Sequence, residues 1–246
     1  MKSLLVIMPV YNNVKTVARA IESVLHQDYE NFHLVIIDDK STDGSYEVVN
    51  QYSDRENVTV VQNETNGGVQ FSRNVGLEMF INGDWDVFTV HDHDDYSYPN
   101  RFSLIMREFV EDDVVVVFPT HVCTHEDLTI RYSNGNPEIY YRDEGHAFYS
   151  RVVVDNLGYF YNTRHGSGDT EYMWRSMAWL NTTSYKSVDS QEPLYLRVIH
   201  QNNLTYNSEY VNLTKEMYSK YKVDIMRMIP TKNFYREKFF KRYFAQ

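Results

Sequence analysis

Acidic side chains follow two of the apolar runs in the first half of the chain. Asp38 and Asp39 come directly after residues 34–37, and Asp92-His93-Asp94-Asp95 follows residues 87–90. In an open α/β sheet, ligands bind outside the carboxyl ends of the parallel strands, so these acidic groups are expected to meet at one edge. Carboxylates gathered there repel one another unless a cation lies among them. The pattern predicts a cation site, although a solvated acidic turn would show the same string.

Two carboxylates of the second group are spaced so that both can face one ion. Asp92 and Asp94 are two residues apart at an expected strand end. Mg²⁺ and Mn²⁺ prefer a few carboxylates together with phosphate oxygens, so we expect one of these ions beside a diphosphate. His200 follows the last strand-like run and suits the ion as a third ligand, with a merely hydrogen-bonded histidine as the alternative. His146 has no ligand spacing and is expected to be structural or to contact an acceptor.

The elements that must position these residues are those of a mostly parallel sheet. Short β-branched runs alternate with amphipathic helical patterns over the first 120 residues, which is typical of strands joined by crossover helices. The expected strands are residues 4–9, 34–37, 58–61, 87–90 and 114–118, and the expected helices are residues 14–25, 46–52, 69–80 and one that begins at Pro99. After residue 120 the alternation weakens, with short strands expected around 134–137, a helix over 151–157 and a glycine-rich loop at 166–168.

The composition is that of a folded acidic protein. The chain has 246 residues, 42% of them hydrophobic, and a net charge of −10, which excludes disorder as the main state and argues against a dedicated nucleic-acid binder. Cys123 is the single cysteine, so no disulfide framework exists and a reducing compartment is expected. The longest apolar runs fall short of the roughly 20 residues of a membrane-spanning helix. Without a cleavable leader pattern, a cytoplasmic protein is expected.

Three motifs in sequence order resemble the family 2 glycosyltransferases of the GT-A fold. They are Pro9-Val10-Tyr11-Asn12, residues 36–43 and residues 66–76. Asp92-His93-Asp94-Asp95 then falls where that family carries its metal-binding Asp-x-Asp, and residues 157–160 through 168–172 resemble its acceptor-side segment. The resemblance covers residues 3–205. One departure is clear, because the family usually has Glu-Asp where this chain has Gly168-Asp169.

The resemblance implies an α/β protein with one Rossmann-like GT-A domain. That domain would span residues 1–207, with a nucleotide-sugar-binding half at 1–120 and an acceptor-binding half at 121–207. Residues 208–246 would form a C-terminal helical extension. The implied activity is metal-assisted, inverting transfer of a sugar from a UDP-sugar to an acceptor hydroxyl, with Mn²⁺ or Mg²⁺ as cofactor.

The resemblance also implies roles for single residues. Asp39 would accept a hydrogen bond from uracil, since an ionised carboxylate suits an imide N–H. Tyr11 would stack on the base, and Arg73 would bind the base edge or a phosphate. Asp92 would reach the ribose, Asp94 would hold the metal, and Asp169 would deprotonate the acceptor. The other expected nucleotide-sugar-binding residues are Pro9, Asn12, Asn66 and His93.

Two classes of function remain open at this point. A non-catalytic nucleotide-sugar or glycan binding module would have the same fold, since fold does not guarantee chemistry. The joint presence of Asp39, Asp94 and Asp169 favours the enzyme. The acceptor stays undetermined among a lipid-linked sugar, another glycan, a protein and a modified nucleic-acid base, because loops carry that specificity.

The C-terminal segment differs in charge from the rest of the chain. Residues 227–246 contain six basic residues and one acidic residue, so this segment carries +5 while residues 1–226 carry −15. Over residues 231–246 aromatic and cationic side chains fall on opposite halves of a helical wheel, which predicts a basic amphipathic helix. It could contact a membrane surface, an acidic partner or nucleic acid, or pack on its own domain.

Overall fold

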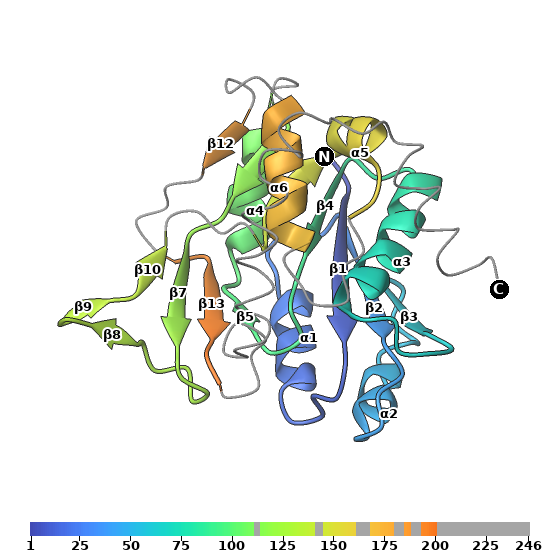
Figure 1. Ribbon diagram of the computed structural model, residues 1–246, viewed down its shortest axis with the longest axis vertical. Helices are drawn as coiled ribbons and strands as arrows, with labels where there is room; N and C mark the ends of the chain where they lie inside the picture. Colours follow the sequence, from blue (N-terminus) through green and yellow to red (C-terminus); the bar gives the residue numbers. More distant parts are fainter. Residues whose placement is uncertain (111–113, 141–144, 161–167, 180–184, 188–192, 201–246) are drawn as a thin grey trace, which may run out of the picture.

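The computed structural model describes residues 1–110, 114–140, 145–160, 168–179, 185–187 and 193–200. Its main feature is a sheet of seven described strands in the order β12-β6-β11-β4-β1-β2-β3 (Figure 1). The expected C-terminal extension, residues 208–246 with its helix at 231–246, lies outside the described residues. None of the described helices is long and apolar enough to cross a membrane.

One half of this sheet is entirely parallel. Its strands are β1 (Leu4–Val10), β2 (Phe32–Asp38), β3 (Val58–Gln62) and β4 (Val87–Val90). β1 lies between β2 and β4, and β2 pairs with β3. The carboxyl ends of the four strands therefore lie at one edge, as the sequence predicted.

The other half of the sheet mixes strand directions. β11 (Phe148–Ser150) runs antiparallel between β4 and β6 (Val116–Phe118), and β12 (Tyr185–Ser187) runs parallel to β6. The edge of β4 that faces away from β1 is thus covered by β11, a strand about 60 residues later in the sequence.

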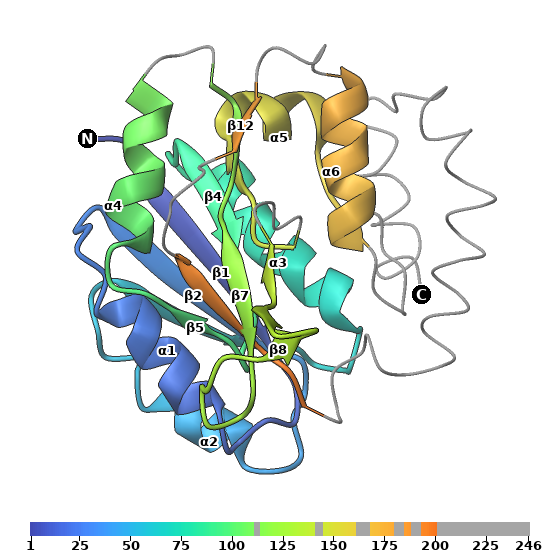
Figure 2. The ribbon, with the colours of Figure 1, turned by 90° about the vertical axis from the view of Figure 1, so that its left-hand side faces the viewer.

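Helices cover both faces of the main sheet. On one face lie α1 (Val17–Leu25), α2 (Ser45–Asn50) and α4 (Arg101–Met106), the last followed by a short 3₁₀ helix at Arg107–Val110. On the other face lie α3 (Val69–Asn82), α5 (Arg151–Leu157) and α6 (Gly168–Trp179). Figure 2 shows the two layers on either side of the strands.

The alternation of β1 explains the two layers. Successive side chains of a strand point to opposite faces; Leu4, Val6 and Met8 belong to the core on the side of α1, and Leu5 and Ile7 to the core on the side of α3. All of them are at most 1% exposed. Burial on both faces is typical of a central parallel strand and explains why the run is apolar throughout.

A second, smaller sheet stands beside the main one. Its order is β10 (Ile139–Tyr140), β7 (His121–Thr124), β13 (Tyr195–Val198) and β5 (Tyr96–Ser97). A hairpin of β8 (Tyr132–Ser133) and β9 (Asn136–Pro137) extends from this region (Figure 1). β13 pairs with β5, so this sheet brings residues near 195 to the chain that leaves β4.

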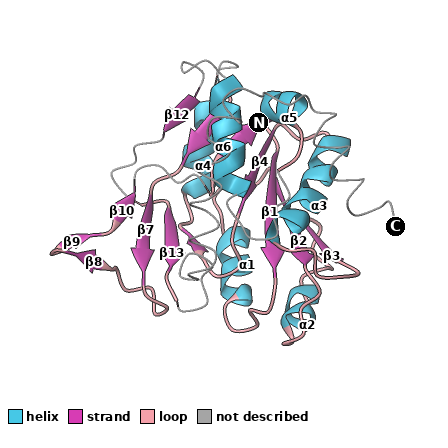
Figure 3. Ribbon diagram, viewed as in Figure 1, coloured by secondary structure: helices cyan, strands magenta, loops and turns pink. Residues whose placement is uncertain are grey.

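The expected elements agree with the structure except at three places, and β11, β12 and α6 have no counterpart among the expected elements. The first helix begins at Val17 and not at residue 14, because the backbone N–H of Val14 donates to Asp43 and residues 13–16 form a turn. Gly168, expected in a loop, is the first residue of α6. The smaller sheet was not predicted, since its strands are too short to show a period. Figure 3 shows the distribution of helices and strands.

Candidate functional site

The edge of the sheet is organised by two consecutive aspartates at the end of β2. Asp38 is paired in register with Val10 of β1 and Gln62 of β3. One of its carboxylate oxygens accepts hydrogen bonds from the Ser41 backbone N–H at 3.1 Å and from the Gln62 amide at 3.0 Å. Asp38 therefore fixes the turn that follows β2.

Asp39 holds the glycine loop in front of α3. Its Oδ1 accepts from Asn63 Nδ2 at 2.7 Å and from Gly67 N at 2.9 Å, and its Oδ2 accepts from Gly68 N at 2.7 Å. The side chain is buried. Since each carboxylate oxygen offers about two lone pairs, Oδ2 retains capacity for one further donor. Gly68 has φ of +88°, a conformation that glycine adopts without strain.

The predicted base-binding residues near β1 lie on the loop that follows it. Tyr11 is 44% exposed and presents its ring at this edge. Asn12, with φ of +48°, uses its side-chain oxygen to accept from Thr42 N at 2.7 Å, and its own N–H donates to Ser41 Oγ at 3.0 Å. Asn66, in the glycine loop, is exposed. The Asn12 side chain thus joins the loops after β1 and β2.

Arg73 connects two carboxylates, one after β4 and one in α6. Its guanidinium contacts Asp92 Oδ1 at 3.1 Å and Asp169 Oδ2 at 3.6 Å, and the arginine side chain is only 4% exposed. Asp92 follows β4, whereas Asp169 lies in the first turn of α6 and is 28% exposed. The structure therefore brings together two predicted site residues that are far apart in the sequence.

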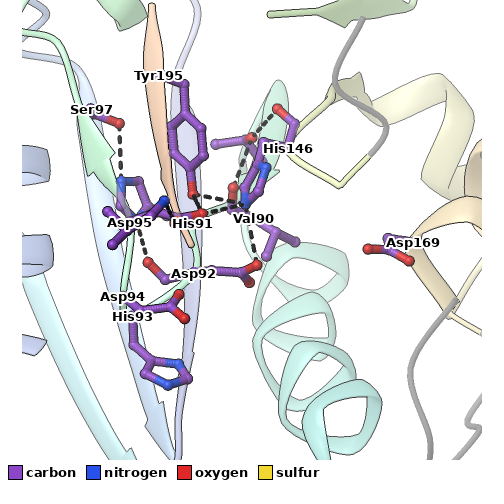
Figure 4. A network of polar contacts seen from close by, with 12 residues as sticks. Val90, His91, Asp92, His93, Asp94, Asp95, Ser97, His146, Asp169 and Tyr195 are labelled. Carbon is purple, nitrogen blue, oxygen red and sulfur yellow. Dashed lines mark hydrogen bonds and ion pairs between the residues drawn. The ribbon is translucent and has the colours of Figure 1, made fainter. Parts of the chain in front are cut away.

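A group of three possible metal ligands lies just after β4. Ligand atoms of Asp92, Asp95 and His146 all lie within 4.8 Å of one another. His146 Nε2 is 3.4 Å from Asp92 Oδ2 and 3.7 Å from Asp95 Oδ2. The Tyr195 hydroxyl donates to Asp95 Oδ2 at 2.6 Å and lies 2.8 Å from His146 Nε2. Figure 4 shows Asp92 pointing toward His146, with Asp169 apart from this group.

Two other predicted ligands form a pair beside that group. His200 Nε2 lies 2.8 Å from Asp94 Oδ2, and this hydrogen bond raises the pKa of His200. The expected set of Asp92, Asp94 and His200 is therefore grouped differently in the structure, because Asp92 turns toward Arg73 and His146. His93, between the two aspartates, directs Nδ1 to the carbonyl oxygen of Pro9 at 2.9 Å. That contact ties the end of β1 to the residues after β4.

At this edge, the pKa values of two neighbouring carboxyl groups are shifted in opposite directions. Burial opposes ionisation of Asp92, but the nearby Arg73 and His146 hold its pKa well below its usual range. For Asp95, burial and the adjacent Asp94 and Asp92 raise the pKa to about 8. Burial and Arg101 lower the pKa of His91, whose ring bonds to Ser97 Oγ at 3.0 Å.

The residues present fit a divalent cation. Carboxylate oxygens and imidazole nitrogens suit Mn²⁺, and Mg²⁺ accepts the carboxylates. Repulsion from Asp94 and Asp92 contributes to the raised pKa of Asp95, and a bound cation would offset that repulsion. The candidate ligands are the group of Asp92, Asp95 and His146 and the neighbouring pair of Asp94 and His200.

The acceptor-side segment is held by buried polar contacts. The Asn74 side chain donates to Phe160 O at 3.0 Å and accepts from Phe160 N at 2.9 Å. Arg175, fully buried, contacts both oxygens of Glu171 at 2.7 and 3.0 Å and donates to Leu157 O and Tyr159 O. Glu171 is therefore a buried partner of Arg175, which leaves Asp169 as the carboxylate of this turn that faces Arg73.

Four residues of the site were not singled out from the sequence as site residues. Asp95 and His146 belong to the ligand group, Tyr195 connects them, and Asn74 anchors Phe160. Asp95 and Asn74 lie within the motifs at 92–95 and 66–76, so their position was a usable signal. Tyr195 lies in the strand-like run before His200, but the pattern does not show that this run pairs with β5. His146 lies just before β11, which was not predicted, and no spacing could have identified it.

Sequence comparison places this chain among glycosyltransferases. A family model described as Glycosyl transferase family 2 matches residues 5–244. The putative glycosyltransferase EpsE of Bacillus subtilis is 40% identical over 100 residues, which are 39% of this chain and 34% of EpsE. The putative colanic acid biosynthesis glycosyl transferase WcaA of Escherichia coli is 27% identical over 195 residues, 78% of this chain and 64% of WcaA. The EpsE match thus spans about a third of that protein.

Solved structures with the same fold include nucleotide complexes. TarS of S. aureus in complex with UDP has a TM-score of 0.64 at 20% identity, covering 99% of this chain and 72% of that chain. The mannosyltransferase PcManGT of Pyrobaculum calidifontis in complex with GDP-Man and Mn²⁺ has a TM-score of 0.65 at 14% identity, covering 99% and 70%. At these identities the likeness shows the GT-A fold alone. Because the family model spans nearly the whole chain and its motif residues meet at the edge described above, this protein belongs to glycosyltransferase family 2.

Proposed function

We propose that this protein transfers a sugar from a UDP-sugar to an acceptor hydroxyl, with inversion at the anomeric carbon. The observation that carries the proposal is the position of Arg73, which contacts Asp92 on the donor side and Asp169 on the acceptor side. In a sugar transfer, the diphosphate leaving group and the acceptor hydroxyl lie on opposite sides of the anomeric carbon. Because Arg73 contacts both carboxylates, Asp92 and Asp169 lie close enough to act on these two groups.

The choice of uridine rests on Asp39 and not on the fold. The two structural neighbours carry UDP and GDP-Man at TM-scores of 0.64 and 0.65, so fold likeness does not discriminate between the bases. Asp39 Oδ2 accepts one protein hydrogen bond and can accept a second from an imide N–H. Exposed Tyr11 supplies a ring on which the base can stack.

On the donor side, the ligands proposed for Mn²⁺ or Mg²⁺ are Asp94, Asp92 and His200, with His146 and Asp95 adjacent. When bound, the ion would neutralise charge on the departing diphosphate. Arg73 adds a fixed cation beside it, since its guanidinium is buried and held by carboxylates.

On the acceptor side, Asp169 is proposed as the general base. Its carboxylate is partly exposed and lies at the start of α6. It would take the proton of the acceptor hydroxyl as that oxygen forms a bond to the anomeric carbon and the bond to the diphosphate breaks. A single displacement of this kind inverts the configuration and needs no covalent intermediate.

A donor-hydrolysis screen tests the proposal without knowledge of the acceptor. Purified protein is incubated with UDP-, GDP- and CMP-linked sugars in Mn²⁺, in Mg²⁺ and in chelator, and the released nucleotide is measured. We expect slow release of UDP that requires a metal and is lost in Asp169→Asn. Tight UDP binding by calorimetry with no turnover of any donor or acceptor would overturn the proposal and indicate a binding module.

A further inference from the structure

Gln70 is a buried amide that the proposed reaction has not used. It is the second residue of α3 and is fully buried. Among the described residues, neither its Nε2 nor its Oε1 has a hydrogen-bond partner. A buried amide without partners costs stability that an apolar side chain of the same size would not. Its contribution at this place is therefore the space that it fills.

That space is the one a side chain at position 168 would occupy. A Cβ atom built on Gly168 would lie 2.6 Å from Gln70 Oε1 and 2.9 Å from Gln70 Cγ. Gly168 is in the first turn of α6 and has no left-handed φ, so its backbone would accept any L-residue. The Gln70 side chain therefore occupies the space that a side chain at position 168 would need.

The contact lies beside the two groups that the reaction needs. Gln70 and Arg73 are three residues apart on α3 and share one face of the helix. Gly168 directly precedes Asp169, which lies 3.6 Å from Arg73. The Gln70 side chain of α3 thus lies against the start of α6, next to Asp169. Position 168 is also where this chain departs from the Glu-Asp pair described above.

We propose that Gln70 is a positioning residue for Asp169, and that positions 70 and 168 share one space, which only one of the two side chains can fill. The role of Asp169 rests on the proposed function, but the shared space does not. A shift of about 1 Å in a reacting group can cost about 100-fold in rate, so the spacing of the two helices matters for turnover.

Four variants and one control test the proposal. They are Gln70→Ala, Gly168→Ala, the double variant of both, Gln70→Met, and the control Gly76→Ala. Gly76 lies on the same helix, and its Cβ would meet Ile7 Cγ2 at 2.5 Å in the core. The control therefore strains α3 without touching α6. Each variant is measured for kcat and donor KM in the hydrolysis assay and for urea unfolding.

We expect Gln70→Ala and Gly168→Ala each to lower kcat about 10- to 100-fold, with donor KM within about threefold of wild type. The double variant should be no worse than Gly168→Ala, because the new Cβ enters the vacated space. Gln70→Met should keep kcat within about threefold and unfold at higher urea, since it fills the space without a buried amide. Gly76→Ala should lower the unfolding midpoint and leave kcat within about threefold.

Multiplicative losses of kcat in the double variant, or a loss in Gln70→Met as large as that in Gln70→Ala, would overturn the proposal. If the wild-type protein turns over no donor, the proposed function fails, and the shared space is then read from unfolding alone. In that case Gly168→Ala should destabilise the wild-type background more than the Gln70→Ala background. Equal destabilisation in both would refute the shared space as well.

Discussion

In the proposed donor half of the site and in the proposed acceptor half, the stabilising hydrogen bonds join residues at different separations in the sequence. In the donor half, Asp39, Asp43 and Asn12 bond to backbone N–H groups 28 to 30 residues away. In the acceptor half, the two hydrogen bonds between the Asn74 side chain and the backbone of Phe160 span 86 residues. Loops between neighbouring strands form the first set, whereas the second set requires distant elements to dock. We therefore expect the fold of the donor half to tolerate the loss of a single hydrogen bond better than the fold of the acceptor half does.

The largest expected effect is the loss of turnover when Asp94, a proposed metal ligand of the donor half, is replaced. Asp94→Asn should lower donor turnover roughly 1000-fold, because a bound metal stabilises the leaving group by several kcal/mol. Turnover in Mn²⁺ and UDP affinity by calorimetry are the measurements. Equal UDP affinity of the wild-type protein in Mn²⁺ and in chelator would remove the metal from the mechanism.

Next in size is the loss of the proposed base in the acceptor half. Asp169→Asn should lower transfer roughly 100-fold or more, since general base catalysis contributes about 10²–10⁴-fold. UDP affinity should stay within about threefold of wild type, because this residue lies in α6 and not at the strand ends. Transfer at the wild-type rate would exclude Asp169 as the base.

The buried ion pair of α6 tests the stability of the acceptor half. Glu171→Gln removes one charge from a pair in which Arg175 is fully buried. Breaking such a pair typically costs about 3–5 kcal/mol, because a buried charge is left without compensation. Urea unfolding should show this loss, whereas Glu56→Gln at an exposed position should change stability little. Equal stability of the two variants would contradict the prediction.

A smaller loss is expected where the two halves meet. Asn74→Ala removes both hydrogen bonds to the backbone of Phe160, at a cost of about 1–3 kcal/mol for the buried groups left unpaired. Hydrogen exchange at the Phe160 amide should quicken more than exchange in β1. Unchanged protection at Phe160 would show that other contacts hold this segment.

The smallest effect is a pH-dependent one in the donor half. Burial opposes ionisation of Asp43, but hydrogen bonds from the Ser45 hydroxyl and from the N–H groups of Val14 and Ser45 together outweigh it and lower its pKa below its usual value. The stability gained is therefore present above that value and is lost as pH falls through the lowered pKa. Asp43→Ala should cost less than about 1 kcal/mol at pH 7, and this cost should shrink as pH falls through the lowered pKa.

Sequence reasoning succeeded where structure is local. The strands and helices of the first 110 residues follow hydrophobic periodicity, and Asp38, Asp39 and Asp92 follow strands whose carboxyl ends meet at one edge. Such contacts depend on strand order alone, so a pattern of apolar runs is sufficient to place them.

The remaining parts of the site depend on docking between distant segments. Tyr195 reaches Asp95 over 100 residues through a four-residue strand of the smaller sheet. This run was expected to be strand-like, but the other strands of the smaller sheet have only two to four residues, and a pattern of apolar runs does not show how such strands pair. The grouping of Asp92 with His146 likewise depends on which way one side chain turns, and that is decided by Arg73 and not by the Asp-x-Asp spacing.

The placement of β11 has a consequence for synthesis of the chain. β4 is buried on both faces, and its edge away from β1 is covered by Phe148–Ser150. Until the ribosome has released residue 150, the four parallel strands can assemble with an apolar edge that is open to other chains. A nascent chain halted between residues 90 and 147 is therefore expected to need a chaperone, whereas one that has released β11 closes its own edge.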